Sequence, residues 1–251
     1  MINGRPEIER RPDYLPRSPQ EEFIVPLLKE AIEAQIDRLL APRQTQNLVR
    51  VLDVGCGRQP FRARVEKAGA SYHSLDVSAQ EGVNIDFIAR IDQEQLPESV
   101  CEGGLYDLIL CSEVLEHVAE WDLAFANFRS LSNQSAFLIL TCPHFFPLHE
   151  EPYDFWRPTP YAIRYFAQKH GFAIEIETPL GTGWDILGTL LACQTFLPRT
   201  RSFTSRFGNR VCQVMGRWLF ALLRSRRLQD SVVDRGPFYL ANFFVLRKAD
   251  A

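Results

Sequence analysis

One short connection of this chain holds most of the side chains that could transfer a proton. Residues 140–166 read LTCPHFFPLHEEPYDFWRPTPYAIRYF. The candidates in it are His144, His149, Glu150, Asp154, Trp156, Arg157 and Tyr161. An unperturbed histidine titrates at a pKa of about 6.5, which suits a general base at neutral pH. Both histidines are therefore candidate bases, and the carboxylates could bind acceptor hydroxyls or assist a histidine.

The same stretch gives little support for a metal site. Its histidines are spaced H-x4-H with acids following, which differs from helical and zinc-finger spacings. We therefore expect no metal here. The aromatic rings at 153 and 155–156 could stack on a sugar or an aromatic ring. Alternatively, the aromatics at 145–146 and 155–156 fill the edge of a sheet, and Arg157 pairs with a nearby carboxylate.

A glycine-rich turn follows the first buried apolar run. Residues 49–61, VRVLDVGCGRQPF, place Gly55 and Gly57 between a predicted strand and the start of a helix. Glycine allows a positive φ and close approach to a ligand, and a helix N-terminus offers free N–H groups. Asp53 would repel a pyrophosphate, so the loop favours a ligand without phosphates. Pro60 stands where GxGxxG has its third glycine, which weakens a nicotinamide-dinucleotide interpretation.

A second acidic residue ends the next predicted strand. Asp76, in SYHSLDVS, lies 21 residues after Gly55, where a carboxylate can bind both hydroxyls of a ribose. Together with VLDVGCG, IDQEQLP and YDLILCSEVLEHV in this order, residues 48–178 resemble the class I S-adenosylmethionine-dependent methyltransferases. The resemblance implies S-adenosyl-L-methionine as the cofactor. One departure is Gln59, where many members have a third glycine.

The resemblance also implies roles for single residues. The implied cofactor-binding set is Asp53, Gly55, Cys56, Gly57, Asp76, Val77, Asp92, Ser112 and Glu113. The glycine loop would line the methionine end of the cofactor, and Asp76 would bind the ribose. Asp92 would lie near the adenine amino group, with Asp86 as a second candidate. Ser112 and Glu113 would form the floor between cofactor and acceptor. His117 is expected to orient local backbone.

Residues 143–172 are similar to a bacterial methyltransferase subgroup with the pattern PHxxPxHxxPxDxWRxTxxxxRxxxxxxGF. This implies a small-molecule or glycan acceptor. Because methyl transfer to a hydroxyl needs a base, we expect O-methylation of a sugar or another small hydroxylated acceptor, with His144 or His149 as that base. Open alternatives are N-methylation, a nicotinamide-dependent oxidoreductase and a non-catalytic cofactor-binding protein. Some methyltransferases bind a diol through magnesium, which leaves a metal as an alternative to its expected absence.

The elements that must position these residues follow from the hydrophobic pattern. Apolar residues recur at helical spacing between 18 and 41. From residue 48, short apolar runs alternate with helical stretches at 61–68, 118–131 and 160–170. Such alternation predicts an α/β fold, a Rossmann-like, doubly wound, seven-stranded and mostly parallel sheet. The last strand, FYLANFFVLRK, is expected to be antiparallel at the edge of the sheet.

We divide the chain into 1–47 as an N-terminal helical extension, 48–180 as the cofactor-binding core, 181–230 as a basic helical insertion or cap, and 231–251 as the final strand. Residues 186–229 contain eight arginines and no acidic residue, in a chain of net charge −3. Apolar runs lie in the same segment. We expect a helical cap or a homodimer surface whose arginines pair with the acidic core. Contact with an anionic membrane, which basic amphipathic helices bind, is the alternative. Nucleic-acid binding is not expected, because the rest of the chain is acidic.

The composition is that of an ordinary globular protein, with 46% hydrophobic and 24% charged residues. The sequence has no long apolar run and no signal-peptide pattern, so we expect a cytoplasmic protein that could be peripheral to the inner face of the membrane. The six cysteines lack metal-type spacing, and we expect them to be structural.

Overall fold

The computed structural model describes residues 14–41, 49–194, 200, 202–229, 231 and 236–249. Parts of the expected N-terminal extension (1–13 and 42–47) and of the insertion (195–199, 201 and 230) lie outside the described residues, as do residues 48, 232–235 and 250–251. The helices are α1 (Val25–Leu40), α2 (Arg62–Lys67), α3 (Trp121–Leu131), α4 (Pro160–Lys169), α5 (Gly183–Cys193), α6 (Phe203–Leu223) and α7 (Arg226–Gln229). The strands are β1 (Arg50–Val54), β2 (Ser71–Asp76), β3 (Phe87–Ile88), β4 (Tyr106–Ser112), β5 (Ser132–Pro143), β6 (Phe172–Leu180) and β7 (Ala241–Lys248). Short 3-10 helices lie at Pro19–Glu22, Glu98–Cys101 and Leu115–His117.

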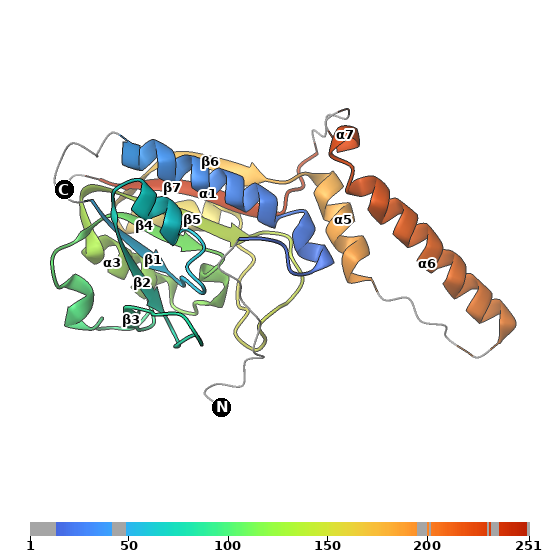
Figure 1. Cartoon of the computed structure of the whole chain (residues 1–251), viewed down its shortest axis with the longest axis horizontal. Helices are drawn as coiled ribbons and strands as arrows, with labels where there is room; N and C mark the ends of the chain where they lie inside the picture. The colour runs from blue at the N-terminus through green and yellow to red at the C-terminus, as the bar shows by residue number, and fades with distance from the viewer. Residues whose placement is uncertain are drawn as a thin grey trace.

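The strands form one seven-stranded sheet in the order β3-β2-β1-β4-β5-β7-β6 (Figure 1). Strands β1 to β5 pair in parallel, and β7 is antiparallel to both of its neighbours. The α/β, mostly parallel sheet predicted from the sequence is thereby confirmed. The expected position of the last strand was wrong, since β7 lies between β5 and β6 and β6 forms the edge. The first six residues of β7 are buried, as a strand covered on both faces requires.

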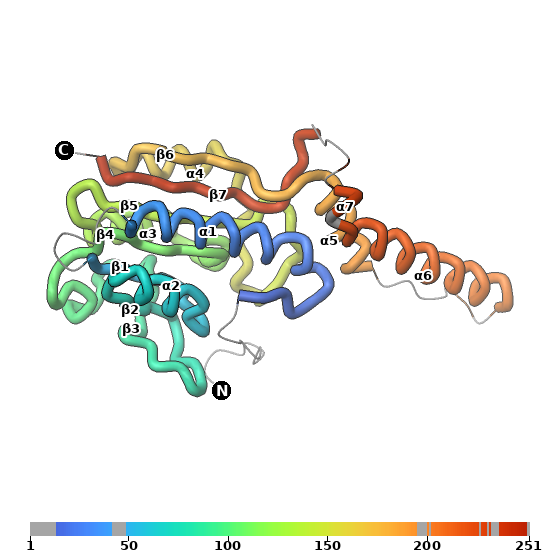
Figure 2. Tube along the Cα trace, turned by 45° about the horizontal axis from the view of Figure 1, so that its top comes forward, coloured from blue at the N-terminus to red at the C-terminus, as the bar shows by residue number. Residues whose placement is uncertain are grey.

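Helices cover both faces of the sheet because its central strands alternate between two cores (Figure 2). Val51 and Leu108 pack with α1 and α2 on one face, whereas their neighbours Leu52 and Ile109 pack with α3 and α4 on the other. This two-residue period is what a strand dictates, since successive side chains point to opposite faces. The sheet is therefore doubly wound, as predicted.

The parallel pairing brings the loops that carry the candidate residues to one edge of the sheet. Val54 of β1 pairs with Leu75 of β2 and with Cys111 of β4, and Ser112 pairs with Thr141 of β5. The glycine loop and the turns after β2, β4 and β5 all leave the sheet at these carboxyl ends. Ligands of open α/β sheets bind at this edge.

Helices α5, α6 and α7 are inserted between β6 and β7, and α6 extends away from the body of the molecule (Figure 1). The C-terminal end of α6 is anchored. The ring of Phe220 packs edge-on against Phe23 at 5.7 Å, and the indole N–H of Trp184 donates to the carbonyl of Leu223 at 2.9 Å. The rest of α6 projects from this anchor. None of the described helices combines the length and apolar character needed to cross a bilayer.

Candidate functional site

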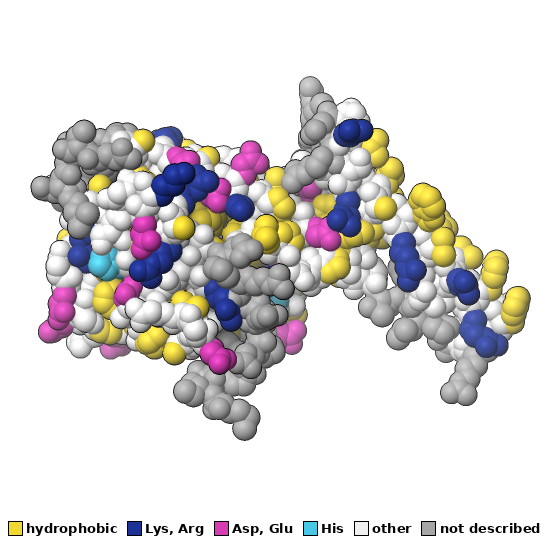
Figure 3. All heavy atoms as spheres, viewed as in Figure 1, with side chains coloured by type: hydrophobic (Ala, Val, Ile, Leu, Met, Phe, Trp, Pro, Cys, Tyr) yellow, Lys and Arg dark blue, Asp and Glu magenta, His cyan; other side chains and the backbone are white. Residues whose placement is uncertain are grey.

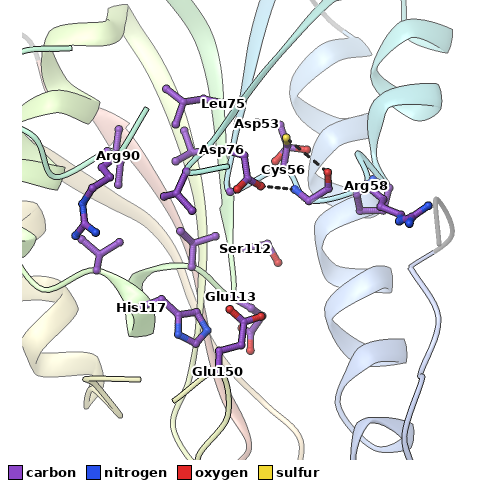
Figure 4. A pocket seen from close by; sticks show the side chains of 18 of the residues that line it. Asp53, Cys56, Arg58, Leu75, Asp76, Arg90, Ser112, Glu113, His117 and Glu150 are labelled. Carbon is purple, nitrogen blue, oxygen red and sulfur yellow. Dashed lines mark hydrogen bonds between the residues drawn. The ribbon is translucent and has the colours of Figure 1, made fainter. Parts of the chain in front are cut away.

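A cavity of about 280 Å³ lies at the carboxyl edge of the sheet (Figure 4). Its lining includes all nine residues proposed to bind the cofactor, namely Asp53, Gly55, Cys56, Gly57, Asp76, Val77, Asp92, Ser112 and Glu113. They come from the ends of β1, β2 and β4 and from the loop after β3. The volume and the mixed lining are typical of a pocket for a small molecule.

The glycine loop has a backbone that side chains could not adopt without strain. Gly55 has a φ of +67°, and a Cβ added to it would lie 2.3 Å from Cγ2 of Val114. Gly57 has a φ of +52°, and its N–H donates to Oδ2 of Asp76 at 2.9 Å (Figure 4). Gln59 also has a positive φ, of 57°, which a glycine would adopt more easily. The loop is thereby held against the end of β2.

Asp53 is a buried carboxylate at one end of the pocket. Its Oδ2 accepts a hydrogen bond of 2.6 Å from the hydroxyl of Tyr72. Burial raises the pKa of Asp53 to about 7, opposed by the bond from Tyr72 and reinforced by the nearby charge of Asp76. The ionised form is therefore poorly compensated in the free protein. A cationic ligand group beside this carboxylate would stabilise it.

The two candidates for the adenine end differ in position. Asp92 lines the pocket, and its two oxygens each accept a bond of 2.9 Å from the guanidinium of Arg90, which also lines the pocket. Asp86 is not among the lining residues. Its Oδ2 accepts bonds from the backbone and hydroxyl of Ser74. The position in the pocket therefore favours Asp92 over Asp86 as the candidate near the adenine. Arg90 fixes the orientation of its two oxygens.

The two candidate bases are separated by the structure. His149 lines the pocket together with Glu150, and His117 lies beside them. His144 is not a lining residue. Its ring stacks on Tyr239 at 4.4 Å, and its Nδ1 lies 3.0 Å from the carbonyl of Pro158. Only one of the two predicted histidines is therefore in a position to meet a ligand in this pocket.

The remaining residues proposed for acceptor binding lie outside the pocket lining. Asp154 accepts from the backbone N–H of His149 at 2.9 Å and forms two bonds, of 2.5 and 2.7 Å, with Arg157. The indole N–H of Trp156 donates to the carbonyl of Val118. Tyr161 is 71% exposed on α4. Asp154 and Arg157 thus fix the loop that carries His149.

Two carboxylates lie near His117 and His149. Glu113 directly follows β4 and lines the pocket, and Glu116 is buried behind it in the 3-10 helix Leu115–His117. In the described part of the chain, Oε1 of each is buried and accepts no hydrogen bond. Burial raises the pKa of Glu113 to about 7, and burial together with the charge of Glu113 raises the pKa of Glu116. Glu113 also has a positive φ, of 52°.

Sequence reasoning missed several residues of the site. Tyr14 and Arg17 line the pocket from the segment before α1, and the hydroxyl of Tyr14 lies 3.4 Å from Oγ of Ser112. No local pattern in that segment signals such a contact. Glu116, buried beside the pocket, was also missed, and its position three residues after Glu113 is the signal that could have identified it. His117, which was expected to orient local backbone, contacts the carbonyl of Tyr153 and also lines the pocket. Figure 4 shows Glu113, His117 and Glu150 gathered at one end of the pocket.

Known proteins share this architecture. The Methyltransferase domain family matches residues 26–175 of the chain. A ubiquinone biosynthesis O-methyltransferase from Erwinia tasmaniensis is 33% identical over 82 residues, which make up 28% of this chain and 32% of that protein. The matched segment thus spans about a third of the relative's length.

Two solved structures are similar in fold at low sequence identity. An S-adenosylmethionine-dependent methyltransferase from Archaeoglobus fulgidus has a TM-score of 0.50 and 16% identity, with 88% of this chain and 94% of that chain covered. Magnesium protoporphyrin IX methyltransferase from Synechocystis PCC 6803, solved with bound S-adenosylmethionine, has the same TM-score and identity, with 92% and 84% covered. These similarities concern the fold.

Proposed function

Because the chain belongs to the Methyltransferase domain family and has the class I, S-adenosylmethionine-dependent fold, we propose that it methylates a hydroxyl of a sugar or another small acceptor. The observation that carries the proposal is that Glu113, His117 and His149 line one end of the pocket, with the buried Glu116 beside the two histidines. Amine acceptors need only to be bound neutral, whereas a hydroxyl must lose its proton. A cluster of carboxylates and imidazoles suits the second case.

The residues at the opposite end of the pocket fit the cofactor. S-adenosylmethionine supplies a methyl group on a positively charged sulfur. The buried carboxylate of Asp53 suits a positively charged ligand, since its own charge is poorly compensated in the free protein. The carboxylate of Asp76 ends β2, where it can accept the hydroxyls of a ribose. A pyrophosphate would meet two carboxylates here, which disfavours the nicotinamide alternative.

O-methylation has further support from the relatives. The similar protein from Erwinia tasmaniensis is named as an O-methyltransferase. Because the similarity covers a third of that protein, it supports the type of acceptor atom and leaves the acceptor molecule open.

A direct test incubates the full chain with extracts of its source cells and methyl-labelled S-adenosylmethionine, followed by mass spectrometry. A labelled methyl ether is expected, and tight binding of NAD without binding of S-adenosylmethionine in calorimetry would overturn the proposal.

The two predicted histidines provide a matched pair of variants. We expect His149→Ala to lower kcat at least 100-fold, because its ring lies in the pocket beside Glu116, whereas His144→Ala keeps its rate within a few-fold. Initial rates of label transfer measure both. Equal losses in the two variants would contradict the placement of the acceptor at His149.

We also propose that α6 docks on an anionic membrane surface. Its exposed face carries large apolar side chains, including Phe203 at 78% and Trp218 at 76% exposure. Arg206, Arg210 and Arg217 lie on the same helix, which contains no acidic residue. Figure 3 shows apolar and basic side chains following one another along α6. A basic helix with exposed aromatic side chains is suited to the interface of anionic lipids.

Because the apolar side chains of α6 are exposed, a membrane is favoured over the two other roles considered for this helix, a cap over the site and a homodimer surface. Helix α6 extends away from the body of the molecule (Figure 1), its large apolar side chains are exposed, and it contributes no residue to the pocket lining, which argues against a cap over the site. Two copies pairing through α6 would bring like charges together, since each helix carries arginines without acids. Each basic residue near an anionic bilayer contributes about 1 kcal/mol.

Vesicle flotation tests the docking of α6. We expect binding to vesicles that contain phosphatidylglycerol and little binding to phosphatidylcholine vesicles. Replacing Phe207 and Trp218 with Ser should abolish binding, and Ile88→Ser, an exposed apolar residue on β3, serves as the matched control. Absence of flotation with anionic vesicles, or a stable dimer in light scattering that Trp218→Ser dissociates, would contradict the proposal.

A further inference from the structure

Three potential ligand atoms converge beside the pocket. Nε2 of His117 lies 3.8 Å from Oε1 of Glu116, and Nε2 of His149 lies 3.9 Å from the same oxygen. The donor atoms of these three residues all lie within 4.8 Å of one another. They reach this point from the 3-10 helix after β4 and from the loop after β5. Two imidazoles therefore face one carboxylate oxygen.

The other nitrogen of each imidazole lies close to oxygen acceptors. Nδ1 of His117 lies 2.8 Å from the carbonyl of Tyr153. Nδ1 of His149 lies 3.2 Å from the carbonyl of Pro147 and 3.3 Å from Oδ2 of Asp154. Nη2 of Arg157 also lies 3.4 Å from this Nδ1, but its shorter bonds, of 2.9 and 2.7 Å, go to Pro147 and Asp154. These oxygens favour a proton on Nδ1, which leaves the lone pair of each Nε2 directed toward Glu116. Histidines that bind metals are oriented in this way by carbonyls and carboxylates.

Among the described residues, no cationic side chain donates a hydrogen bond to Oε1 of Glu116 or of Glu113. Glu116 is fully buried, and its other oxygen, Oε2, accepts only a weak bond of 3.8 Å from the thiol of Cys142. The nearby Arg157 is committed elsewhere, because its guanidinium binds Asp154 and the carbonyls of Phe146 and Pro147. A buried charge without a partner costs several kcal/mol. A cation between Glu116 and the two histidines would remove this cost.

We propose that Glu116, His117 and His149 bind a divalent transition-metal ion. Two imidazoles with a carboxylate suit Zn²⁺, Mn²⁺, Fe²⁺ or Co²⁺. Ligands at about 2.1 Å from such an ion in a tetrahedral arrangement lie about 3.4 Å apart. The observed separations of 3.8 and 3.9 Å need only small side-chain rotations to reach this geometry.

The role of this ion in the reaction rests on the proposed function. With the ion bound, the two histidines are ligands rather than proton acceptors. The acceptor hydroxyl would coordinate the ion, which lowers the pKa of that hydroxyl and releases its proton to water. The oxygen then forms its bond to the methyl carbon as the bond between that carbon and sulfur breaks. The ion thereby takes over the work that a histidine base would otherwise do.

Metal binding is measured directly on the full chain, without turnover. The protein is treated with a chelator, dialysed and titrated with Mn²⁺ or Zn²⁺ in a calorimeter, and its metal content as purified is measured by mass spectrometry. We expect about one ion per chain. His149→Ala and Glu116→Gln should weaken binding at least tenfold, as loss of a ligand does, whereas His144→Ala should leave it unchanged.

The controls separate the two proposals. Circular dichroism and S-adenosylmethionine affinity report whether each variant is folded. If Glu116→Gln does not fold, His149→Ala still tests the site, because it changes a partly exposed loop residue. Absence of binding of either ion by the native chain, or equal affinity in His149→Ala, would overturn the metal site. A chain that binds S-adenosylmethionine but no metal overturns this inference alone. A chain that binds metal but not S-adenosylmethionine overturns the proposed function alone.

Discussion

Asp53 carries a negative charge that the free protein disfavours, because burial raises its pKa to about 7. In the unfolded chain the same carboxyl titrates near its ordinary value of 3.8. Between these two pH values the folded state holds a proton that the unfolded state has lost, so the free energy of unfolding falls as pH rises through this window. A shift of this size corresponds to a cost on the order of 4 kcal/mol above pH 7.

Asp53→Asn should therefore stabilise the free protein at pH 8 and leave its stability near that of the native chain at pH 4. The amide oxygen can still accept the bond from Tyr72, so the change is close to isosteric. S-adenosylmethionine affinity should fall at least tenfold, since the carboxylate that we propose to face its positive charge is lost. Denaturant unfolding at both pH values and calorimetry measure the two effects. An unchanged stability difference between pH 4 and pH 8 would contradict this account.

The geometry of Gly55 provides a second test among single residues. Gly55→Ala adds a methyl group 2.3 Å from Val114 and places alanine at a φ of +67°. We expect a loss of about 2 to 5 kcal/mol in the free energy of unfolding and weaker cofactor binding. Gly69→Ala is the matched control, because Gly69 has a φ of +80° and nothing within 4 Å of an added Cβ. It should cost only about 1 to 2 kcal/mol, measured by urea denaturation.

Single residues were predictable where local chemistry determines their position. Asp53 and Gly55 stand in one turn, and Asp76 ends a recognisable strand, so their meeting at the carboxyl edge follows from the parallel pairing. Tyr14 reaches Ser112 across 98 positions, and no property of its own segment indicates this contact. His144 and His149 look equivalent in sequence. They differ because the chain turns between them and packs one against Tyr239.

At the scale of elements, the junction of α5 with the N-terminal segment should be sensitive to a single methyl group. A Cβ added at Gly188 would lie 2.2 Å from the ring of Phe23, so Gly188→Ala should destabilise the protein by about 1 to 3 kcal/mol. Gly216→Ala in α6 meets nothing within 4 Å and should instead stabilise it by up to about 1 kcal/mol. Thermal unfolding compares the two. Similar effects of both variants would show that α5 is not packed as described.

The identity of the elements followed from hydrophobic periodicity, whereas their order in the sheet did not. The apolar run at β7 predicts a buried strand. It does not predict which strands β7 pairs with, because those strands lie far away in the sequence. β7 pairs with β5 about a hundred residues earlier, as Asn242 does with Cys142. Its antiparallel direction was foreseen, and its insertion between β5 and β6 was not. Residues 241–246, ANFFVL, are apolar except for Asn242, which argues against an edge position, and this signal was available in the sequence.

At the scale of the whole molecule, the pocket is built from segments that are distant in the chain. Its lining extends from Tyr14 before α1 to Glu150 after β5. A ligand that binds there binds only the folded state and therefore stabilises the whole fold. The projecting α6 contributes no lining residue, so the helix that we propose to dock on a membrane is separate from the pocket.

S-adenosylmethionine at one hundred times its Kd should raise the free energy of unfolding by about 2.7 kcal/mol. For a chain of this size each kcal/mol corresponds to about 2 to 4 °C, so we expect Tm to rise by about 5 to 10 °C. Asp53→Asn, measured at the same ligand concentration, should show a smaller rise, because its affinity is lower. Anionic vesicles should leave the ligand-induced shift unchanged, since α6 and the pocket share no residue. A shift that vesicles abolish would instead mean that membrane docking and cofactor binding are coupled through α5 and the N-terminal segment.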